Sequence, residues 1–261
     1  MGAKVISIAN QKGGVGKTTS ALNIALYISE SGQKTLLIDL DPQANATSGI
    51  GVDTQQIHHS IYDVISNDEH INDCIYPTPF EQLHLVPSCS NLAGADVELS
   101  TTVSRETILK QRLTPILDEY DYIIIDCPPS LSLLTLNAFA FTHQLVVPVQ
   151  CEYFALEGLA KLLNTIQLIK ERLNPTLSIL GIVLTMFDRR TSLNRQVVND
   201  AKHHFKELIF DTIIPRNIRL AEAPSFGLPI ALYAPKSSGS IAYYHLTKEV
   251  IERAKTNKST G

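Results

Sequence analysis

The clearest chemistry in this chain lies at residues 11–19, which read Gln-Lys-Gly-Gly-Val-Gly-Lys-Thr-Thr. Glycines let the backbone curl around an anion, so that peptide N–H groups and the N-terminus of a following helix converge on one phosphate. A lysine and a threonine at the end of such a loop can reach the β- and γ-phosphates and a magnesium ion. The segment therefore predicts a loop that binds a Mg-nucleoside triphosphate. The expected binding residues are Lys12, Gly13, Gly14, Val15, Gly16, Lys17, Thr18 and Thr19, with Thr18 on the metal.

This loop departs from the usual pattern G-x-x-x-x-G-K-[ST] in two ways. Gln11 stands where the first glycine is expected, and Lys12 adds a second lysine to Lys17. Two lysines around one triphosphate would be redundant within one subunit, so we expect Lys12 to reach the phosphates of another subunit. The alternative is an ordinary solvated lysine on the surface of the loop.

Two further segments place carboxylates after apolar runs. Residues 36–43 read Leu-Leu-Ile-Asp-Leu-Asp-Pro-Gln, and residues 123–130 read Ile-Ile-Ile-Asp-Cys-Pro-Pro-Ser. Alternation along a strand puts Asp39 and Asp41 on the same side. Such carboxylates can orient an attacking water or hold Mg²⁺ through water, as Asp126 would in the Walker B position. The alternative for an aspartate at a strand end is a turn or a helix cap.

The elements that would position these residues alternate between strands and helices. Continuous apolar runs are typical of a parallel sheet that is covered on both faces. In such sheets ligands bind at the carboxyl ends of the strands, where the loop and the aspartates fall. We expect an α/β fold with strands at 4–9, 35–40, 83–86, 122–127, 144–149 and 179–185. We expect helices at about 18–31, ended by Gly32, near 60–65 and at 240–254.

Composition places the chain among ordinary globular proteins. Its 261 residues are 44% hydrophobic and 18% charged, with a net charge of −4. No apolar run approaches the roughly 18 residues of a transmembrane helix, and the N-terminus does not resemble a signal peptide. The four cysteines form no C-x-x-C pair, so we expect reduced thiols and a cytoplasmic protein. We expect one domain over 1–261, with about 256–261 disordered.

The segment 12–18 fits K-G-G-x-G-K-[ST], the deviant Walker A motif, and resembles the ParA/MinD class of P-loop NTPases. Three more segments, 41–48, 148–158 and 214–227, are similar to the ParA/Soj-type partition ATPases. The resemblance implies a mostly parallel, twisted sheet of seven or eight strands with helices on both faces. It also implies ATP and Mg²⁺ as cofactors, ATP hydrolysis that is weak on its own, and a homodimer that forms on ATP.

The resemblance also assigns catalytic and interface roles. Lys12 crosses the interface of the dimer, and Glu152 lines that interface near the nucleotide. Asp41 positions or activates the hydrolytic water. The implied catalytic set is Asp41, Lys12 and Lys17.

Further roles concern the metal and the base. Asp39 and Asp126 would approach Mg²⁺ through water, while Thr18 binds it directly. Pro215 and Asn217 match the loop that reads the adenine. The assignments of Asp39, Pro215 and Asn217 follow from the resemblance alone.

Basic residues suggest DNA as a partner. The segment 186–206 holds five Lys or Arg against two Asp, and such a patch can bind DNA phosphates without reading sequence. By resemblance, Arg190 matches a DNA-contacting arginine of the family, and Arg219 is a second candidate. Arg189, beside Arg190, and Arg216, in the same loop as Arg219, complete the four arginines that we expect to bind DNA. The alternative is a solvated basic helix face.

The implied function is therefore partition of DNA. The ATP-bound dimer would bind double-stranded DNA non-specifically, associate with the nucleoid, and release the DNA when a ParB-type partner stimulates hydrolysis. An alternative is a ParA-like ATPase that positions another protein cargo. A MinD-like membrane protein is disfavoured, because the helix expected at 240–254 lacks a cationic and an apolar face, and we expect no membrane binding. A redox carrier like the nitrogenase iron protein is disfavoured by the partition-like segments, although the cysteines alone do not dismiss it.

Overall fold

Short runs of β-branched and other apolar residues form the strands of the computed structural model, which describes residues 2–256. Such side chains pack well on a pleated surface, and every residue of β2 and β5 is buried. The strands are β1 (Lys4–Ile8), β2 (Thr35–Asp39), β3 (Tyr76–Pro77), β4 (Leu83–Val86), β5 (Tyr122–Asp126), β6 (Gln144–Gln150) and β7 (Ser178–Thr185). The six predicted strands are confirmed to within one or two residues at their ends.

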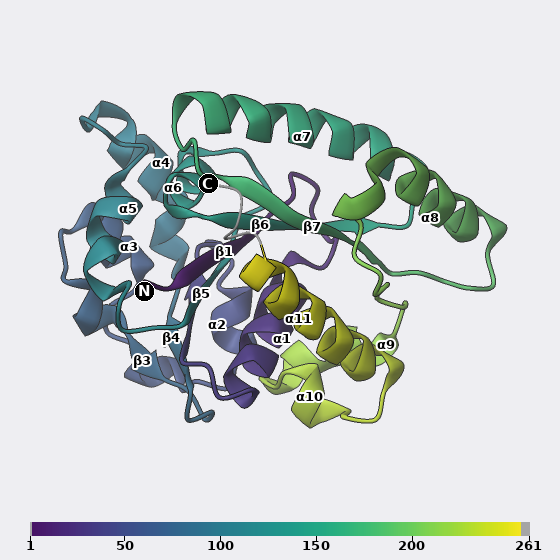
Figure 1. Cartoon of the computed structure of the whole chain (residues 1–261). Helices are drawn as coiled ribbons and strands as arrows, with labels where there is room; N and C mark the ends of the chain where they lie inside the picture. Colours follow the sequence, from purple (N-terminus) through teal and green to yellow (C-terminus); the bar gives the residue numbers. More distant parts are fainter. Residues whose placement is uncertain (1, 257–261) are drawn as a thin grey trace.

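The strands form one seven-stranded sheet in the order β3-β4-β2-β5-β1-β6-β7 (Figure 1). Neighbouring strands are parallel except for β3 and β4, which are antiparallel. This confirms the predicted α/β fold with a mostly parallel sheet of seven or eight strands. The edge strand β3 was not predicted, because two residues are too few to show a periodic pattern.

The register of the central strands brings the predicted carboxylates to one edge. β2 pairs with β5 so that Asp39 lies opposite Asp126, and β1 pairs with β5 so that Ile8 lies opposite Asp126. The carboxyl ends of three neighbouring strands therefore meet, as expected for a ligand site in a parallel sheet.

Helices connect the strands and cover both faces of the sheet (Figure 1). The α-helices are α1 (Lys17–Glu30), α2 (Asn45–Gly49), α3 (Ile61–Ser66), α4 (Ala95–Glu98), α5 (Ile108–Leu113), α6 (Leu133–Phe141), α7 (Ala155–Arg172), α8 (Ser192–Phe205), α9 (Ile218–Glu222), α10 (Ile230–Tyr233) and α11 (Ser238–Thr256). The predicted end of α1 at Gly32 is confirmed: this glycine has φ +84° and its N–H donates to the carbonyl of Ser29 at 2.9 Å. Thr256, expected at the start of a disordered tail, is the last residue of α11, and the rest of that expected tail, 257–261, lies outside the described residues.

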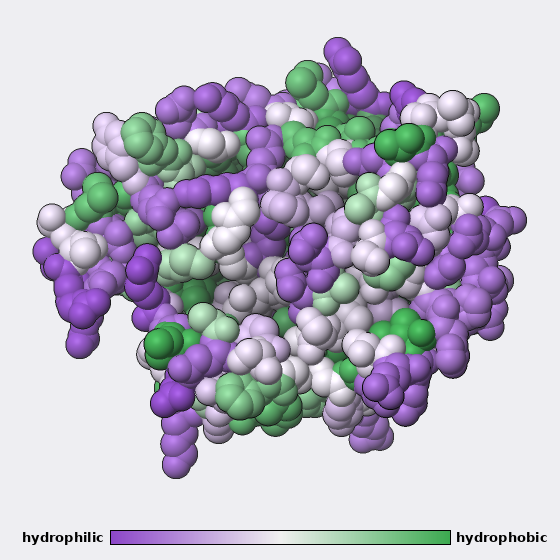
Figure 2. Space-filling model, turned by 180° about the vertical axis from the view of Figure 1, so that it is seen from behind, coloured by the Kyte–Doolittle hydropathy of each residue, from purple (hydrophilic) through white to green (hydrophobic). Residues whose placement is uncertain are grey.

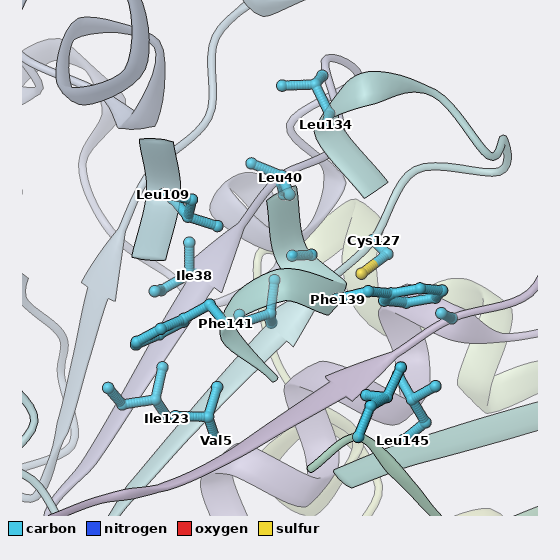
Figure 3. Close-up of a cluster of buried hydrophobic side chains, with 14 of the residues drawn as sticks. Val5, Ile38, Leu40, Leu109, Ile123, Cys127, Leu134, Phe139, Phe141 and Leu145 are labelled. Carbon is cyan, nitrogen blue, oxygen red and sulfur yellow. The ribbon is translucent and has the colours of Figure 1, made fainter. Parts of the chain in front are cut away.

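Alternation along the strands sends neighbouring side chains into two separate cores. In β1, Val5 belongs to the core that α5, α6 and α7 cover, and Ile6 belongs to the core that α1 and α11 cover. Ile123 and Ile124 of β5 divide in the same way. Figure 3 shows part of the first core, with Phe139 of α6 beside side chains from the strands. Burial on both faces explains why the strands read as continuous apolar runs.

The segment that follows α8 runs back along β7 toward the carboxyl edge. The N–H of Phe210 donates to the carbonyl of Ile182 at 2.9 Å, and the N–H of Ile214 donates to Leu184 at 2.8 Å. The Arg253 guanidinium of α11 stacks on the Phe210 ring at 4.3 Å and donates to the Ile209 carbonyl at 2.8 Å. These contacts fix the path of the chain into the loop after Ile214.

The surface mixes polar and apolar side chains, as in most globular proteins. Figure 2 shows one face on which apolar residues are scattered among hydrophilic ones. Within residues 2–256, no helix is long and apolar enough to cross a membrane.

Gly181 of β7 makes room for Phe210, which leads to a direct test of this packing. A Cβ at position 181 would lie 2.5 Å from the Phe210 ring. We therefore expect Gly181→Ala to lower the free energy of unfolding by about 1–3 kcal/mol, because the core is already filled. Urea unfolding followed by circular dichroism measures this change.

Gly158→Ala is the matched control for this substitution. Gly158 lies in α7, and a Cβ there would meet no atom of residues 2–256 within 4 Å. The control should raise the free energy of unfolding by about 0.5–1 kcal/mol, through helix propensity. Equal effects of the two substitutions would contradict the packing described for Gly181.

Candidate nucleotide site and basic surface

The phosphate loop leaves β1 and turns directly into α1. Gly14 and Gly16 have φ values of +72° and +90°, which residues with side chains rarely adopt. A Cβ built on Gly13 or Gly14 would meet no other part of the described chain within 4 Å, so the space beside these two glycines is open. Asn10 secures the entry to the loop: its amide donates to the Pro148 carbonyl at 2.7 Å, and its oxygen accepts from the Lys12 N–H at 3.0 Å.

Lys17 is buried and folds back over the loop. Its ammonium donates to the carbonyl of Lys12 at 3.1 Å. Burial lowers the pKa of Lys17, whereas the nearby carboxyl groups of Asp126 and Asp41 raise it. The Lys17 ammonium group lies beside the glycine loop, where it could pair with a phosphate group.

Asp39 is fully buried and already hydrogen-bonded. Its Oδ2 accepts from both the N–H and the hydroxyl of Thr47 at 2.8 Å, and its Oδ1 accepts from the Asp41 N–H at 3.1 Å. Burial raises the pKa of Asp39, and these hydrogen bonds oppose that shift. Asp39 thus ties α2 to the end of β2, and its role beside the metal stays a prediction.

Asp126 lies opposite Asp39 and is also fully buried. Neither of its carboxylate oxygens accepts a hydrogen bond within residues 2–256. Burial and then the charge of Asp39 raise the pKa of Asp126, against opposing effects of the Thr18 side chain and Lys17. A buried carboxyl group of this kind is costly unless a cation or a donor completes it.

The residues at this edge fit a magnesium ion. Asp126 offers two buried oxygens without partners in the described chain, and the Thr18 hydroxyl lies on the first turn of α1. Magnesium binds one or two carboxylates and keeps several waters or phosphate oxygens as its other ligands. No three His, Cys, Asp or Glu side chains of residues 2–256 form a metal site by themselves. The remaining ligands would therefore be water and phosphate.

Asp41 stands two residues beyond Asp39 and is buried. Its Oδ1 accepts from the Gln43 N–H at 3.0 Å, and its carbonyl accepts from the Ala44 N–H at 2.9 Å. Asp41 therefore stabilises a turn, which was the alternative interpretation of the sequence. This turn lies at the edge of the sheet where the catalytic role was predicted.

A cavity of about 490 Å³ opens beside the start of α1. Four predicted nucleotide-binding residues line it: Gly16, Thr19, Pro215 and Asn217. The Asn217 oxygen accepts from the Arg219 N–H at 2.9 Å and its amide donates to the Ser238 hydroxyl at 3.0 Å, which fixes the start of α9. The cavity adjoins Gly16 of the loop, so its position suits a nucleoside attached to phosphates in the loop.

Sequence reasoning missed several residues that line this cavity, including Thr185, Met186 and Tyr243. Thr185 was the predicted end of a strand at the carboxyl edge, and that position alone could have indicated it. Tyr243 comes from α11 and hydrogen-bonds Ser20 across 223 residues at 3.0 Å. No local pattern in the sequence could have indicated that contact.

The two residues predicted at a dimer interface lie side by side in one chain. Lys12 Nζ and Glu152 Oε2 form an ion pair at 2.5 Å, and each side chain is about half exposed. Glu152 follows the end of β6, and the aromatic side chains of Tyr153 and Phe154 beside it are largely exposed. The pair is therefore accessible from outside the subunit.

Three of the four predicted DNA-binding arginines share a second cavity. This cavity has a volume of about 530 Å³ and is lined by Arg189, Arg190 and Arg216. Arg219 does not line it; its guanidinium pairs with Glu222 on α9 at 2.9 Å.

Arg190 is exposed but is held by its own neighbour. Its guanidinium forms a two-point contact with the Asp188 carboxylate, with Nε to Oδ1 at 2.9 Å and Nη2 to Oδ2 at 2.7 Å. This contact holds the pKa of Asp188 well below its usual range. An incoming phosphate would compete with Asp188 for Arg190.

Asn194 of α8 joins the loop that carries Glu152 to the loop that carries Arg190. Its amide donates to the Cys151 carbonyl at 2.8 Å, and its oxygen accepts from the Asp188 N–H at 2.6 Å. One side chain therefore links the predicted interface to the predicted DNA surface.

Comparisons with known proteins agree with this geometry. Residues 3–179 match the family described as AAA domain. The chain is 50% identical over 247 residues to the sporulation initiation inhibitor protein Soj of Bacillus subtilis, which covers 95% of this chain and 98% of that protein. It is 50% identical over 250 residues to the chromosome partitioning protein ParA of Myxococcus xanthus, which covers 96% of this chain and 88% of that protein.

A solved structure shares the fold. The crystal structure of cobyrinic acid a,c-diamide synthase from Mycobacterium smegmatis, with bound ATP analogue and magnesium, superposes with a TM-score of 0.84. It is 35% identical and covers 98% of this chain and 97% of its own. With the deviant loop, the paired aspartates and the full-length similarity taken together, the chain belongs to the ParA/Soj family of partition ATPases and is an ATPase.

Proposed function

We propose that this protein is an ATP-driven switch for DNA partition. ATP closes two subunits into a dimer, the dimer binds double-stranded DNA without reading sequence, and hydrolysis releases it. The observation that carries the proposal is that the nucleoside cavity and the arginine-lined cavity share Pro215 and Arg216 as a common wall. A ligand in the first cavity therefore lies against residues of the second.

The nucleotide would be ATP with Mg²⁺, as in the similar crystal structure. The glycine loop and Lys17 would bind the phosphates, Thr18 would bind the metal, and Asp39 and Asp126 would approach it through water. Pro215 and Asn217 would border the adenine. Bound magnesium would neutralise charge that develops on the phosphates.

Lys12 and Glu152 would act at the dimer interface. Their ion pair is half exposed, so water screens it and little free energy opposes its exchange. In a closed dimer Lys12 would instead face the triphosphate of the other subunit, a stronger partner because it carries more negative charge. Removal of the γ-phosphate would return Lys12 to Glu152.

Asp41 would orient the attacking water. A carboxylate beside the γ-phosphate can accept a proton from water or fix its direction. Asp41 is suited to this, because the Gln43 N–H holds one of its oxygens in place.

DNA would bind at Arg189, Arg190, Arg216 and Arg219. Dimerisation would place two such surfaces on one DNA molecule, so that weak phosphate contacts combine. The Asp188 carboxylate would compete with DNA for Arg190, because a DNA phosphate must displace this carboxylate before it can bind the guanidinium. A ParB-type partner would accelerate hydrolysis, and the ATP-bound protein would reside on the nucleoid in the cytoplasm.

Asp41→Ala tests the hydrolytic role. We expect hydrolysis to fall about 100-fold or more, because the water loses its orienting group. ATP binding should persist, and light scattering after size exclusion should show a dimer that stays closed with ATP. Hydrolysis at the parental rate would show that Asp41 has been assigned wrongly.

Lys12→Ala, made in the Asp41→Ala background, tests the interface role. We expect the variant to bind ATP but to remain a monomer by light scattering, because the cross-subunit charge is gone. Glu152→Gln in the same background is the control, since it removes the competing carboxylate but keeps Lys12. A stable dimer of the Lys12→Ala variant would contradict the proposal.

Arg190→Glu tests the DNA surface, with ATP bound in the Asp41→Ala background. We expect weaker binding to a random duplex and a salt dependence that is shallower by about one unit per subunit, because one phosphate contact is lost. Arg172→Glu, at the far end of α7, makes the same charge change as a control. If both variants bind DNA alike, the arginine-lined cavity is not the DNA site.

A further inference from the structure

The phosphate loop is held from beneath by a strand that is not adjacent to β1. Thr185 is the last residue of β7, which is separated from β1 by β6. Its hydroxyl donates to the carbonyl of Val15 at 2.9 Å, and the side chain is buried. A buried hydroxyl and a buried carbonyl therefore satisfy each other in the middle of the loop.

This hydrogen bond fixes the direction of one peptide N–H. In a trans peptide the carbonyl and the following N–H point in opposite directions, and no cis peptide occurs among the described residues. Because Thr185 holds the Val15 carbonyl from beneath, the Gly16 N–H points to the opposite, concave side of the loop. That side is where N–H groups must converge to bind phosphate.

The peptide on the other side of Gly16 is fixed as well. The Gly16 carbonyl accepts from the Ser20 N–H at 2.9 Å, and the Ser20 hydroxyl hydrogen-bonds the Tyr243 hydroxyl at 3.0 Å. A Cβ on Gly16 would lie 3.9 Å from the Tyr243 oxygen and 4.0 Å from Cγ2 of Thr185. Both side chains thus form the floor on which Gly16 rests.

The hydroxyl of Thr185 is itself held in place. The Thr185 carbonyl accepts from the Cys151 N–H at 3.0 Å, and β7 pairs Thr185 with Gln150. A β-branched side chain has few χ1 rotamers, so an anchored backbone also anchors the hydroxyl. The Val15 carbonyl therefore meets a rigid donor.

From this geometry we infer that Thr185 is a positioning residue for nucleotide binding, which acts by holding the Gly16 N–H toward the phosphates. Tyr243 supports the same glycine from α11. The hydroxyl of Thr185 donates to the loop at the Val15 carbonyl, so the effect of removing this hydroxyl should appear in affinity for the phosphates of ATP and ADP.

Thr185→Val tests this inference, because valine keeps the shape of threonine and replaces its hydroxyl with a methyl group. We expect the dissociation constants of ATP and ADP to rise about tenfold, since the Val15 carbonyl loses its buried donor. Competition against a fluorescent ADP analogue, with Mg²⁺ present, measures both constants. The affinity for AMP should change less than that for ADP, because AMP lacks the β-phosphate.

Thr185→Ser is the matched rescue variant. It keeps the hydroxyl and removes the methyl group, so its ATP affinity should stay within roughly twofold of the parent. Parental ATP affinity in Thr185→Val, or equal losses in the serine and valine variants, would overturn the inference.

A third variant keeps the inference testable if Thr185→Val does not fold. Tyr243→Phe removes only the hydroxyl that reaches Ser20. Like Thr185→Val, it should weaken the binding of ADP more than the binding of AMP. The measurement is made on protein that shows a cooperative thermal transition. Unchanged ADP affinity in Tyr243→Phe would contradict the inference that the side chains beneath Gly16 position it for phosphate binding.

Discussion

Burial of two carboxyl groups at one edge of the sheet is the constraint on which this structure depends. Asp39 and Asp126 lie opposite each other on β2 and β5, and both are fully buried. Thr47 and Lys17 offset part of the cost, but Asp126 keeps two oxygens without a partner in residues 2–256. The free energy gained by burying apolar side chains in the two cores must offset the cost of burying these two carboxyl groups. The proposed magnesium ion, together with a triphosphate, would supply the missing partners at this edge.

Much of this architecture follows from local sequence. The apolar runs predict the strands, because both faces of the sheet are covered and no alternation with polar residues is needed. Gly32 predicts the end of α1, because a left-handed residue there requires no side chain. The loop at 11–19 and the aspartates after β2 and β5 could be placed at one edge, because parallel strands end together. The predictions for Asp39 and Asp126 therefore needed only the direction of two strands.

The remaining parts of the site depend on contacts between distant segments. Tyr243 reaches Ser20 only because α11 packs on α1, and no pattern near either residue records this. The pairing of Lys12 with Glu152 in one subunit was also not predicted, since both were assigned to an interface between subunits. Arg219 was grouped with the other arginines, but it lies outside their cavity, because the turn into α9 directs it toward Glu222.

The two hydrogen bonds by which Asn194 joins the loops of Cys151 and Asp188 have a consequence for how the sequence of such a protein can change. Its two partners, the carbonyl of Cys151 and the N–H of Asp188, are main-chain groups. The spacing of the two loops therefore does not depend on which side chains the loops carry. Mutation can change the charge and size of residues on either loop, while Asn194 and the pairing of β6 with β7 preserve the distance between the loops. Substitution of the residues on the two loops and retention of the spacing between the loops are in this way separable.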